Sequence, residues 1–263
     1  MARPCGGIER IEARFSGHAF DPHRHDTYAV GLTLAGVQSF TYRGARRDSL
    51  AGQAIVLHPD EVHDGRSGDG SGFAYRMAYV APGLIRAALD GLGAGPRLPF
   101  VPTPVTSDPR MVAAASRTLA ALDSQPEPLE VDQTVLVLAE GLAAVADDPV
   151  RPARSGVDGP AMDRVRDYLD ASRAGPVTSE RLEAVGGMDR WQLARQFRLR
   201  FGTSPYRYLV MRRLDAARAA ILGGAGLAEA AIMAGFADQS HMTRQFRAAY
   251  GMSPGRWRDL LLR

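Results

Sequence analysis

The 263 residues of the chain are enough for two ordinary domains, each of which can bury its own hydrophobic core. All 32 basic side chains are Arg, and they are unevenly distributed. Residues 160–263 hold 17 Arg against 10 acidic residues, whereas residues 1–159 hold 15 Arg against 19 acidic residues. A basic half joined to an acidic half indicates a nucleic-acid-binding module attached to a domain with another task. The one cysteine, Cys5, excludes an internal disulfide and a four-cysteine zinc site.

Targeting signals are not expected. Charged residues interrupt the start of the chain, which argues against a signal peptide. No run approaches 18 apolar residues, the length that a membrane helix needs. We therefore expect a cytoplasmic protein.

The first half of the chain is predicted to contain strands over residues 27–80. Short β-prone runs lie at 28–34, 37–42, 53–57 and 73–80, with glycine-rich turns between them. Many short strands between such turns are typical of a β-sandwich or barrel. Apolar residues then recur at helical spacing over 109–123 and 129–146, which predicts two amphipathic helices.

A change of composition marks the domain boundary. Residues 147–160 hold three Pro, two Gly and mixed charge, and everything after them has helical periodicity. We therefore predict an α+β protein of two domains, with a β-barrel and two following helices in the first and only helices in the second. The predicted domains are 1–147 and 160–263, joined by a linker at 148–159.

The second domain contains an internal repeat. Residues 179–208 and 228–257 align without a gap at an offset of 49, with eleven identical positions. Self-similarity of this kind indicates one supersecondary unit that is used twice. In each copy a short helix leads to a glycine turn and an Asp N-cap, Asp189 or Asp238, which opens a longer helix. The layout predicts two helix-turn-helix units, at about 179–201 and 227–250.

In a helix-turn-helix, the N-terminal part of the second helix enters the major groove. This placement nominates Arg190, Trp191, Ala194 and Arg195 in the first unit as base-reading residues. In the second unit it nominates Gln239, Ser240, His241 and Arg244. Arg pairs well with guanine and Gln with adenine. Five further arginines are predicted to bind phosphates without reading sequence: Arg198, Arg200, Arg207, Arg247 and Arg256.

A connecting helix is predicted between the units, over residues 206–222. Its apolar stripe includes Leu209, Leu214 and Ile221. Two recognition helices in successive major grooves must lie about 34 Å apart, and a stiff connector suits that requirement.

The segments LARQFRLRFGTSPYRYLVMRRLDAAR and AGFADQSHMTRQFRAAYGMSPGRW are similar to the DNA-binding domain of AraC-type transcription regulators. The resemblance covers residues 160–263. It implies seven helices, with two helix-turn-helix units bridged by a central helix, and specific binding of double-stranded DNA near promoters, where RNA polymerase is a candidate partner. Two positions depart from the repeat: Gly187 stands where the second copy has Phe236, and Ala194 is too short to hydrogen-bond a base.

Three histidines in the first half are candidate ligand-binding residues. His23 and His25 are two positions apart, so that on a strand both face one way, and the segment from His58 to His63 follows the run at 53–57. Together they resemble the two signatures of a cupin barrel, the sensor domain common in AraC-type regulators. His23, His25 and His63 match the metal-binding histidines of cupin enzymes, but Ala29 and Val30 stand where an enzyme has Glu.

We therefore expect these histidines to line a pocket for a small-molecule effector, with no cofactor and no enzymatic activity. By the same resemblance, one of the two helices after the barrel is expected to form a homodimer contact. The alternatives are a metal-dependent cupin enzyme with an attached DNA-binding domain, which needs metal on the three histidines, and a constitutive DNA binder whose barrel only dimerises.

Overall fold

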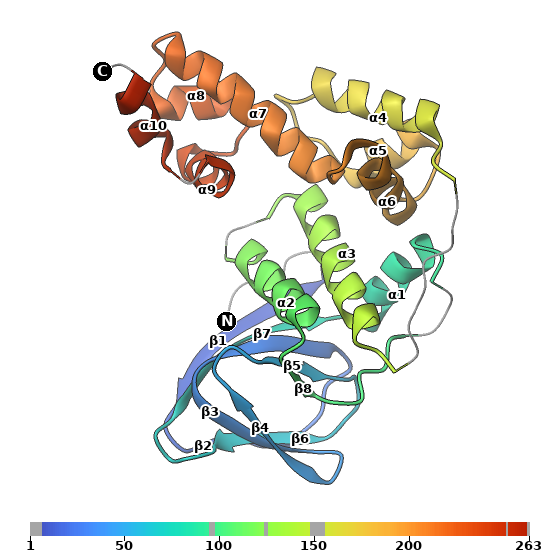
Figure 1. Cartoon of the computed structure of the whole chain (residues 1–263), viewed down its shortest axis with the longest axis vertical. Helices are drawn as coiled ribbons and strands as arrows, with labels where there is room; N and C mark the ends of the chain where they lie inside the picture. Colours follow the sequence, from blue (N-terminus) through green and yellow to red (C-terminus); the bar gives the residue numbers. More distant parts are fainter. Residues whose placement is uncertain (1–6, 95–97, 124–125, 148–155, 251, 262–263) are drawn as a thin grey trace. The chain divides into compact units, whose positions relative to one another are not determined.

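The computed structural model of the chain describes residues 7–94, 98–123, 126–147, 156–250 and 252–261. The chain divides into two compact units, residues 1–154 and 155–263 (Figure 1). The division lies within residues 148–159, the predicted linker. Most of that segment lies outside the described residues, as do Cys5 and Gly251. Among the described helices, none has the length and apolar content to span a membrane.

The first unit is built on antiparallel strands. They are β1 (Ile8–Phe15), β2 (His18–His23), β3 (Tyr28–Tyr42), β4 (Ala45–Leu50), β5 (Ala54–Leu57), β6 (His63–Ser67), β7 (Phe73–Val80) and β8 (Val105–Thr106). One sheet has the order β1-β7-β3-β5-β8, and the second pairs β4 and β6 with β3 and β2 with β6. The strand β3 belongs to both sheets, so the two curve around a common interior.

The strand β3 corrects one prediction, because residues 28–34 and 37–42 form one strand rather than two. Its register against β7 shifts between Thr33 and Ala35, and Gly36 has a φ of +68°. A bulge of this kind bends a strand without ending it. The first half of β3 pairs with β5 and β7, and the second half with β4 and β6.

The interior between the sheets is filled mainly by aromatic and aliphatic side chains, among them Phe40, Tyr42, Phe73, Tyr75 and Met77. Successive residues of a strand face opposite ways, yet Tyr28, Ala29 and Val30 are all buried. The outer face of the sheet that contains β3, β5 and β7 is covered by helix, because α2 packs on these three strands (Figure 1).

Three helices accompany the sheets: α1 (Pro82–Gly91), α2 (Pro109–Ala121) and α3 (Pro128–Ala144). The last two match the predicted helices, whereas α1 was not predicted. All three have Pro in the first turn, where its missing N–H leaves no helical hydrogen bond unmade. Gly141 lets α2 and α3 approach closely, because a Cβ there would lie 2.5 Å from that of Ala114.

The described part of the second unit contains seven helices, which agrees with the expectation. They are α4 (Gly159–Ala171), α5 (Ser179–Gly186), α6 (Arg190–Phe201), α7 (Pro205–Leu222), α8 (Leu227–Met233), α9 (Gln239–Tyr250) and α10 (Pro254–Leu261). The α+β prediction, with a β-sheet domain and helices followed by an all-helical domain, is confirmed.

Candidate DNA interface and ligand pocket

The second helix-turn-helix unit consists of α8 and α9. Gly235 makes the turn with a φ of +88°, a backbone conformation that glycine adopts without strain. The carboxylate of Asp238 then accepts a hydrogen bond from the backbone N–H of His241 at 2.6 Å and caps α9. Met242 and Phe246 are fully buried and anchor α9 to the unit.

The first turns of α9 are open to solvent. Gln239, Ser240 and Arg244 are exposed, as base-reading residues must be. His241 differs, because only 7% of it is exposed and its ring packs edge-on against Phe236 at 5.3 Å. The prediction that His241 reads a base therefore does not fit its position.

The first unit consists of α5 and α6. Here the left-handed residue is Gly187, with a φ of +72°, and not Gly186, which is the counterpart of Gly235. The two turns are thus built differently, and Phe236 occupies the position of Gly187 as a buried side chain. The carboxylate of Asp189 caps α6 through the N–H groups of Trp191 and Gln192.

The four predicted base-reading residues of α6 are less available than those of α9. Trp191 is only 7% exposed, so its predicted base contact does not fit its burial. Arg190 is ion-paired with Glu180 and Glu183, at 2.9 and 3.0 Å. Ala194 and Arg195 are half-buried.

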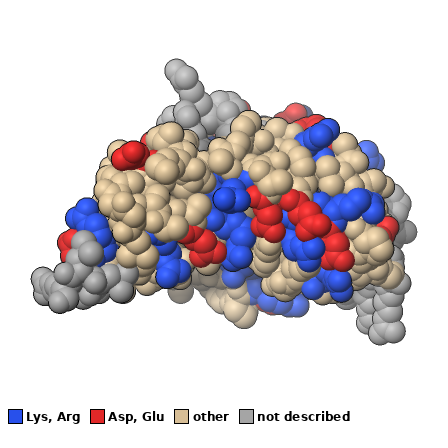
Figure 2. Space-filling model, turned by 90° about the horizontal axis from the view of Figure 1, so that it is seen from above, with Lys and Arg blue, Asp and Glu red and all other residues tan. Residues whose placement is uncertain are grey.

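The predicted phosphate-binding arginines are distributed over α6, α7, α9 and α10. Arg247 and Arg256 are exposed, and Arg198 and Arg207 are half-buried. Arg200 is half-exposed and pairs with Asp163 at 3.2 Å. On the face seen in Figure 2, Arg side chains alternate with Asp and Glu, so the excess of positive charge is not gathered there.

The helix α7 connects the two helix-turn-helix units, and Figure 1 shows α6 near one of its ends and α9 toward the other. Its apolar stripe is buried as predicted, at Leu209, Leu214, Ala217 and Ile221. Sequence reasoning missed Arg213, which is 2% exposed. Its guanidinium donates to the carbonyl oxygens of Arg173 and Gly175, at 2.8 and 3.0 Å, and so fixes the loop between α4 and α5 to α7.

The three candidate histidines of the N-terminal unit, residues 1–154, do come together. The ring of His63 lies 4.4 Å from that of His23 and 4.9 Å from that of His25. In each ring Nδ1 faces a backbone carbonyl oxygen, at 2.8 to 2.9 Å. A carbonyl only accepts, so Nδ1 is the donor in each ring, and in a neutral ring Nε2 is the nitrogen with the lone pair. Among the described residues, no three His, Cys, Asp or Glu side chains are arranged to hold a metal ion.

Burial keeps two histidines neutral. It lowers the pKa of His63 to about 4, with the neighbouring His23 and His25 adding to the effect. Burial likewise lowers the pKa of His58 to about 4. His58 was not predicted to have a role. Its Nε2 accepts from the N–H of Val101 at 3.0 Å and its Nδ1 lies 3.0 Å from the Tyr42 hydroxyl, which ties the segment after α1 to the sheets.

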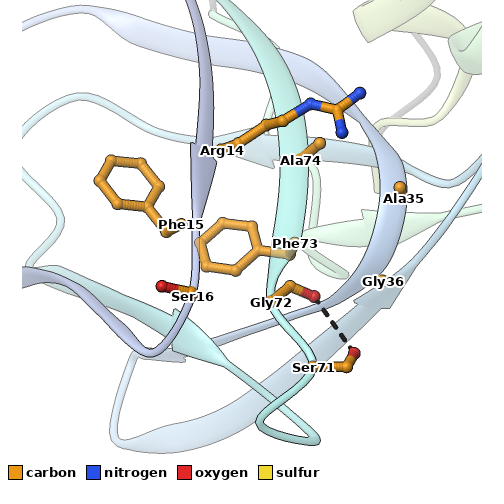
Figure 3. A pocket seen from close by; sticks show the side chains of 9 residues that line it. All are labelled: Arg14, Phe15, Ser16, Ala35, Gly36, Ser71, Gly72, Phe73 and Ala74. Atoms are coloured by element: carbon orange, nitrogen blue, oxygen red, sulfur yellow. Dashed lines mark hydrogen bonds between the residues drawn. The ribbon is translucent and has the colours of Figure 1, made fainter.

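The interior cavity next to the histidines is small, about 30 Å³. His23 and His63 line it together with Gln38 and Tyr75, whereas His25, predicted to line the pocket with them, is not part of its wall. A larger open hollow of about 430 Å³ lies where β1, β3 and β7 meet. Figure 3 shows Arg14 on the same side of the strands as Ala35 and Ala74, with the rings of Phe15 and Phe73 on the other.

Comparison with known proteins gives one match within each half of the chain. Residues 6–139 match the AraC-like ligand binding domain, and residues 183–259 match a helix-turn-helix domain. The uncharacterized HTH-type transcriptional regulator YbfI of Bacillus subtilis (strain 168) is 25% identical over 233 residues, which cover 88% of this chain and 85% of that protein.

Two solved structures are also similar. Wild-type ToxT from Vibrio cholerae strain SCE256, with bound unsaturated fatty acid, is 12% identical with a TM-score of 0.40, covering 98% of this chain and 97% of that one. A probable AraC family transcriptional regulator from Rhodopseudomonas palustris CGA009 is 28% identical with a TM-score of 0.35, covering 37% of this chain and 94% of that one. The first of the matched domains alone spans more than half of the chain. The chain therefore belongs to the AraC family of DNA-binding transcription regulators, which are not enzymes, and carries the family's ligand-binding domain.

Proposed function

We propose that the protein recognises specific duplex DNA sequences through α9 and α6, and that a small molecule bound in the N-terminal unit, residues 1–154, controls this recognition. The observation that carries the proposal is the first turns of α9, where Gln239, Ser240 and Arg244 are exposed on a helix that Asp238 caps and Phe246 anchors. Side chains held by a rigid helix can reach base edges in the major groove.

Phosphate contacts would position the two helices on the duplex. The half-buried Arg207 lies on α7, and the exposed Arg247 and Arg256 lie on α9 and α10. Contacts of this type supply affinity without sequence information, and they release counterions.

The proposed effector site is the interior cavity beside His23 and His63. Two of its wall atoms, Tyr75 Oη and Gln38 Oε1, are buried without a hydrogen-bond partner among the described residues. Buried polar atoms without partners are destabilising by about 1–3 kcal/mol each, so a polar ligand that bonds to both would be stabilised there.

The size of the cavity restricts the ligand. A space of about 30 Å³ holds one water molecule, so any larger effector has to displace side chains of the interior. That displacement offers a link to regulation, because a ligand acts only through different affinities for two arrangements of the protein. The open hollow at Arg14 is large enough for a small organic molecule without rearrangement, and it is the competing location.

A homodimer formed through the helices after the sheets, and contact with RNA polymerase at the promoter, complete the proposed picture. Both are proposals that the resemblance to the family supports. A constitutive DNA binder with the same fold is the alternative, and it is distinguished by a DNA affinity that no small molecule changes.

The direct test is selection of bound duplexes from a random DNA pool by the full chain. We expect a recurring sequence motif and an affinity that falls with salt, with a slope of about −0.9 for each neutralised phosphate on logarithmic axes. A pool that shows no enrichment, or an affinity that is independent of salt, would contradict the proposal.

The effector site is tested by screening small polar molecules for a rise in the melting temperature of the full chain. For a ligand in the interior cavity, the rise should disappear in H63A and remain in R14A. The opposite pattern would place the effector in the open hollow.

A further inference from the structure

Resting on the proposed function, we propose that the second helix-turn-helix unit carries most of the base discrimination. In the first helix-turn-helix unit, two carboxylates form ion pairs with Arg190, the first residue of the recognition helix α6. Arg190 together with Glu180 and Glu183 is called the acidic clamp below.

The acidic clamp engages the edge of the guanidinium formed by Nε and NH2. Glu183 Oε1 accepts from Nε of Arg190 at 3.0 Å and from its backbone N–H at 2.9 Å, and Glu180 Oε1 accepts from NH2 at 2.9 Å. Glu183 Oε2 adds a fourth contact at 3.3 Å. The side chains of Arg190 and Glu183 are less than one-third exposed, so the charge-assisted hydrogen bonds between these two are only partly screened by water. The side chain of Glu180 is 70% exposed, and its pair with Arg190 is screened more strongly.

The repeat supplies an internal comparison, since the offset of 49 pairs each residue of the clamp with one in the second unit. Glu183 corresponds to Ile232, which is exposed, and Arg190 corresponds to the exposed Gln239. The second unit retains one of the two carboxylates, at Glu229. The start of α9 thus presents a neutral amide that no clamp of this kind holds.

The next positions show the same asymmetry. The buried Trp191 corresponds to the exposed Ser240, and Ala194, without a hydrogen-bonding group, corresponds to Thr243. Only Arg195 and Arg244 are alike in type, and of these Arg244 is the more exposed.

The consequence for DNA follows from the electrostatics. To form the bidentate contact with guanine O6 and N7, Arg190 would have to leave two carboxylates. Those carboxylates would then face a duplex that is itself negative, which is unfavourable at short range. The first helix-turn-helix unit is therefore expected to position the protein on the duplex through phosphate contacts. The second helix-turn-helix unit is expected to recognise the base sequence.

The experiment is the selection of duplexes from a random pool by the full chain and its variants, with the enrichment at each position counted. For the wild type we expect one strongly specified block and one weak block about one helical turn away. Q239A should reduce the preference at one position of the strong block by about 5- to 100-fold. R190A should leave both blocks unchanged.

Release of the clamp gives the sharper test. The E180Q/E183Q variant should gain a preference for guanine in the weak block. The matched control D163N/D215N removes two carboxylates that pair with arginines elsewhere in the second unit, and it should raise the overall affinity without changing either block.

Two strong blocks in the wild type, loss of the strong block in R190A, or no new guanine preference in E180Q/E183Q would each overturn the inference. All variants are first shown to melt as the wild type does and to bind duplex DNA at low salt. Failure of the wild type to enrich any sequence would instead contradict the proposed function itself, so the two failures are distinguishable.

Discussion

Gly235, in the turn of the second helix-turn-helix unit, packs directly against the backbone of Arg173, in the loop between α4 and α5 that leads into the first helix-turn-helix unit. A Cβ at Gly235 would lie 2.5 Å from the carbonyl oxygen of Arg173. The same oxygen accepts a hydrogen bond from the buried guanidinium of Arg213, on the connecting helix α7. Three segments that are far apart in sequence therefore meet at one carbonyl group, and this contact fixes the two reading units relative to each other.

The first prediction compares two glycines. G187A should lower the free energy of unfolding of the C-terminal unit, residues 155–263, by about 1–2 kcal/mol. The φ of Gly187 is +72°, but the space around this residue is open. G235A should lower the same free energy by about 2–5 kcal/mol, since the clash with Arg173 adds to a similar φ. Trp191 and Trp257 both lie in this unit, so tryptophan fluorescence in urea measures the effect. Equal losses in the two variants would refute the close packing.

The second prediction concerns two buried tyrosines of the N-terminal unit. Tyr75 Oη has no hydrogen-bond partner among the described residues, so Y75F should leave stability unchanged or raise it slightly. Tyr42 Oη accepts from the His58 N–H at 3.1 Å and lies 3.0 Å from Nδ1 of that ring. Y42F should therefore cost about 1–3 kcal/mol. Hydrogen exchange of the β3 amides measures both, and a large loss in Y75F would show that its hydroxyl has a partner.

The third prediction is a dependence of stability on pH. Burial holds the pKa of His58 and of His63 at about 4, against about 6.5 in the unfolded chain. Between these values the unfolded chain binds protons that the native state does not, so stability falls as the pH drops from 6.5 to 4 and is level above 7. The loss is at most about 3 kcal/mol for each histidine. Imidazole resonances of these two residues that titrate near 6.5 would contradict it.

The fourth prediction separates base reading from phosphate binding on α9, where Arg244 and Arg247 are both exposed. R244A should weaken binding to the selected sequence by about 1–3 kcal/mol and relax the choice at one base pair. R247A should weaken binding to all duplexes alike and reduce the salt slope by about one. Measured affinities for matched and mismatched duplexes distinguish the two, and identical specificity in R244A would remove Arg244 from the readout.

Much of the helical half could be predicted from sequence because its signals are local. Asp189 and Asp238 cap α6 and α9 at the predicted residues, and the predicted bounds of both helices match the structure. The sheet was predicted less completely. The strand β1 was not recognised, although charged and apolar residues alternate from Arg10 to Phe15. The strand β2 pairs with β6 through two register shifts that no simple alternation reveals.

The candidate site could be predicted only as a list of positions. Helical spacing places Arg190, Trp191 and His241 at the start of the recognition helices, but it does not show which of them the rest of the unit covers. The burial of Trp191 and His241 depends on packing between helices. The acidic clamp depends on a turn that brings Glu183 seven residues back onto Arg190. Arg213 looks in sequence like any basic residue of an exposed helix, and only the fold shows that it is buried.

The unbroken course of α7 has a consequence for how such a protein can change over time. Each residue added to or removed from an α-helix turns everything beyond it by about 100° and shifts it by 1.5 Å. An insertion or deletion within Pro205–Leu222 would therefore point one recognition helix away from the duplex, whereas substitutions on α9 leave the geometry intact. Related proteins can therefore acquire new target sequences through substitutions that change which bases are recognised. The spacing between the two recognised stretches of DNA is expected to stay the same among them.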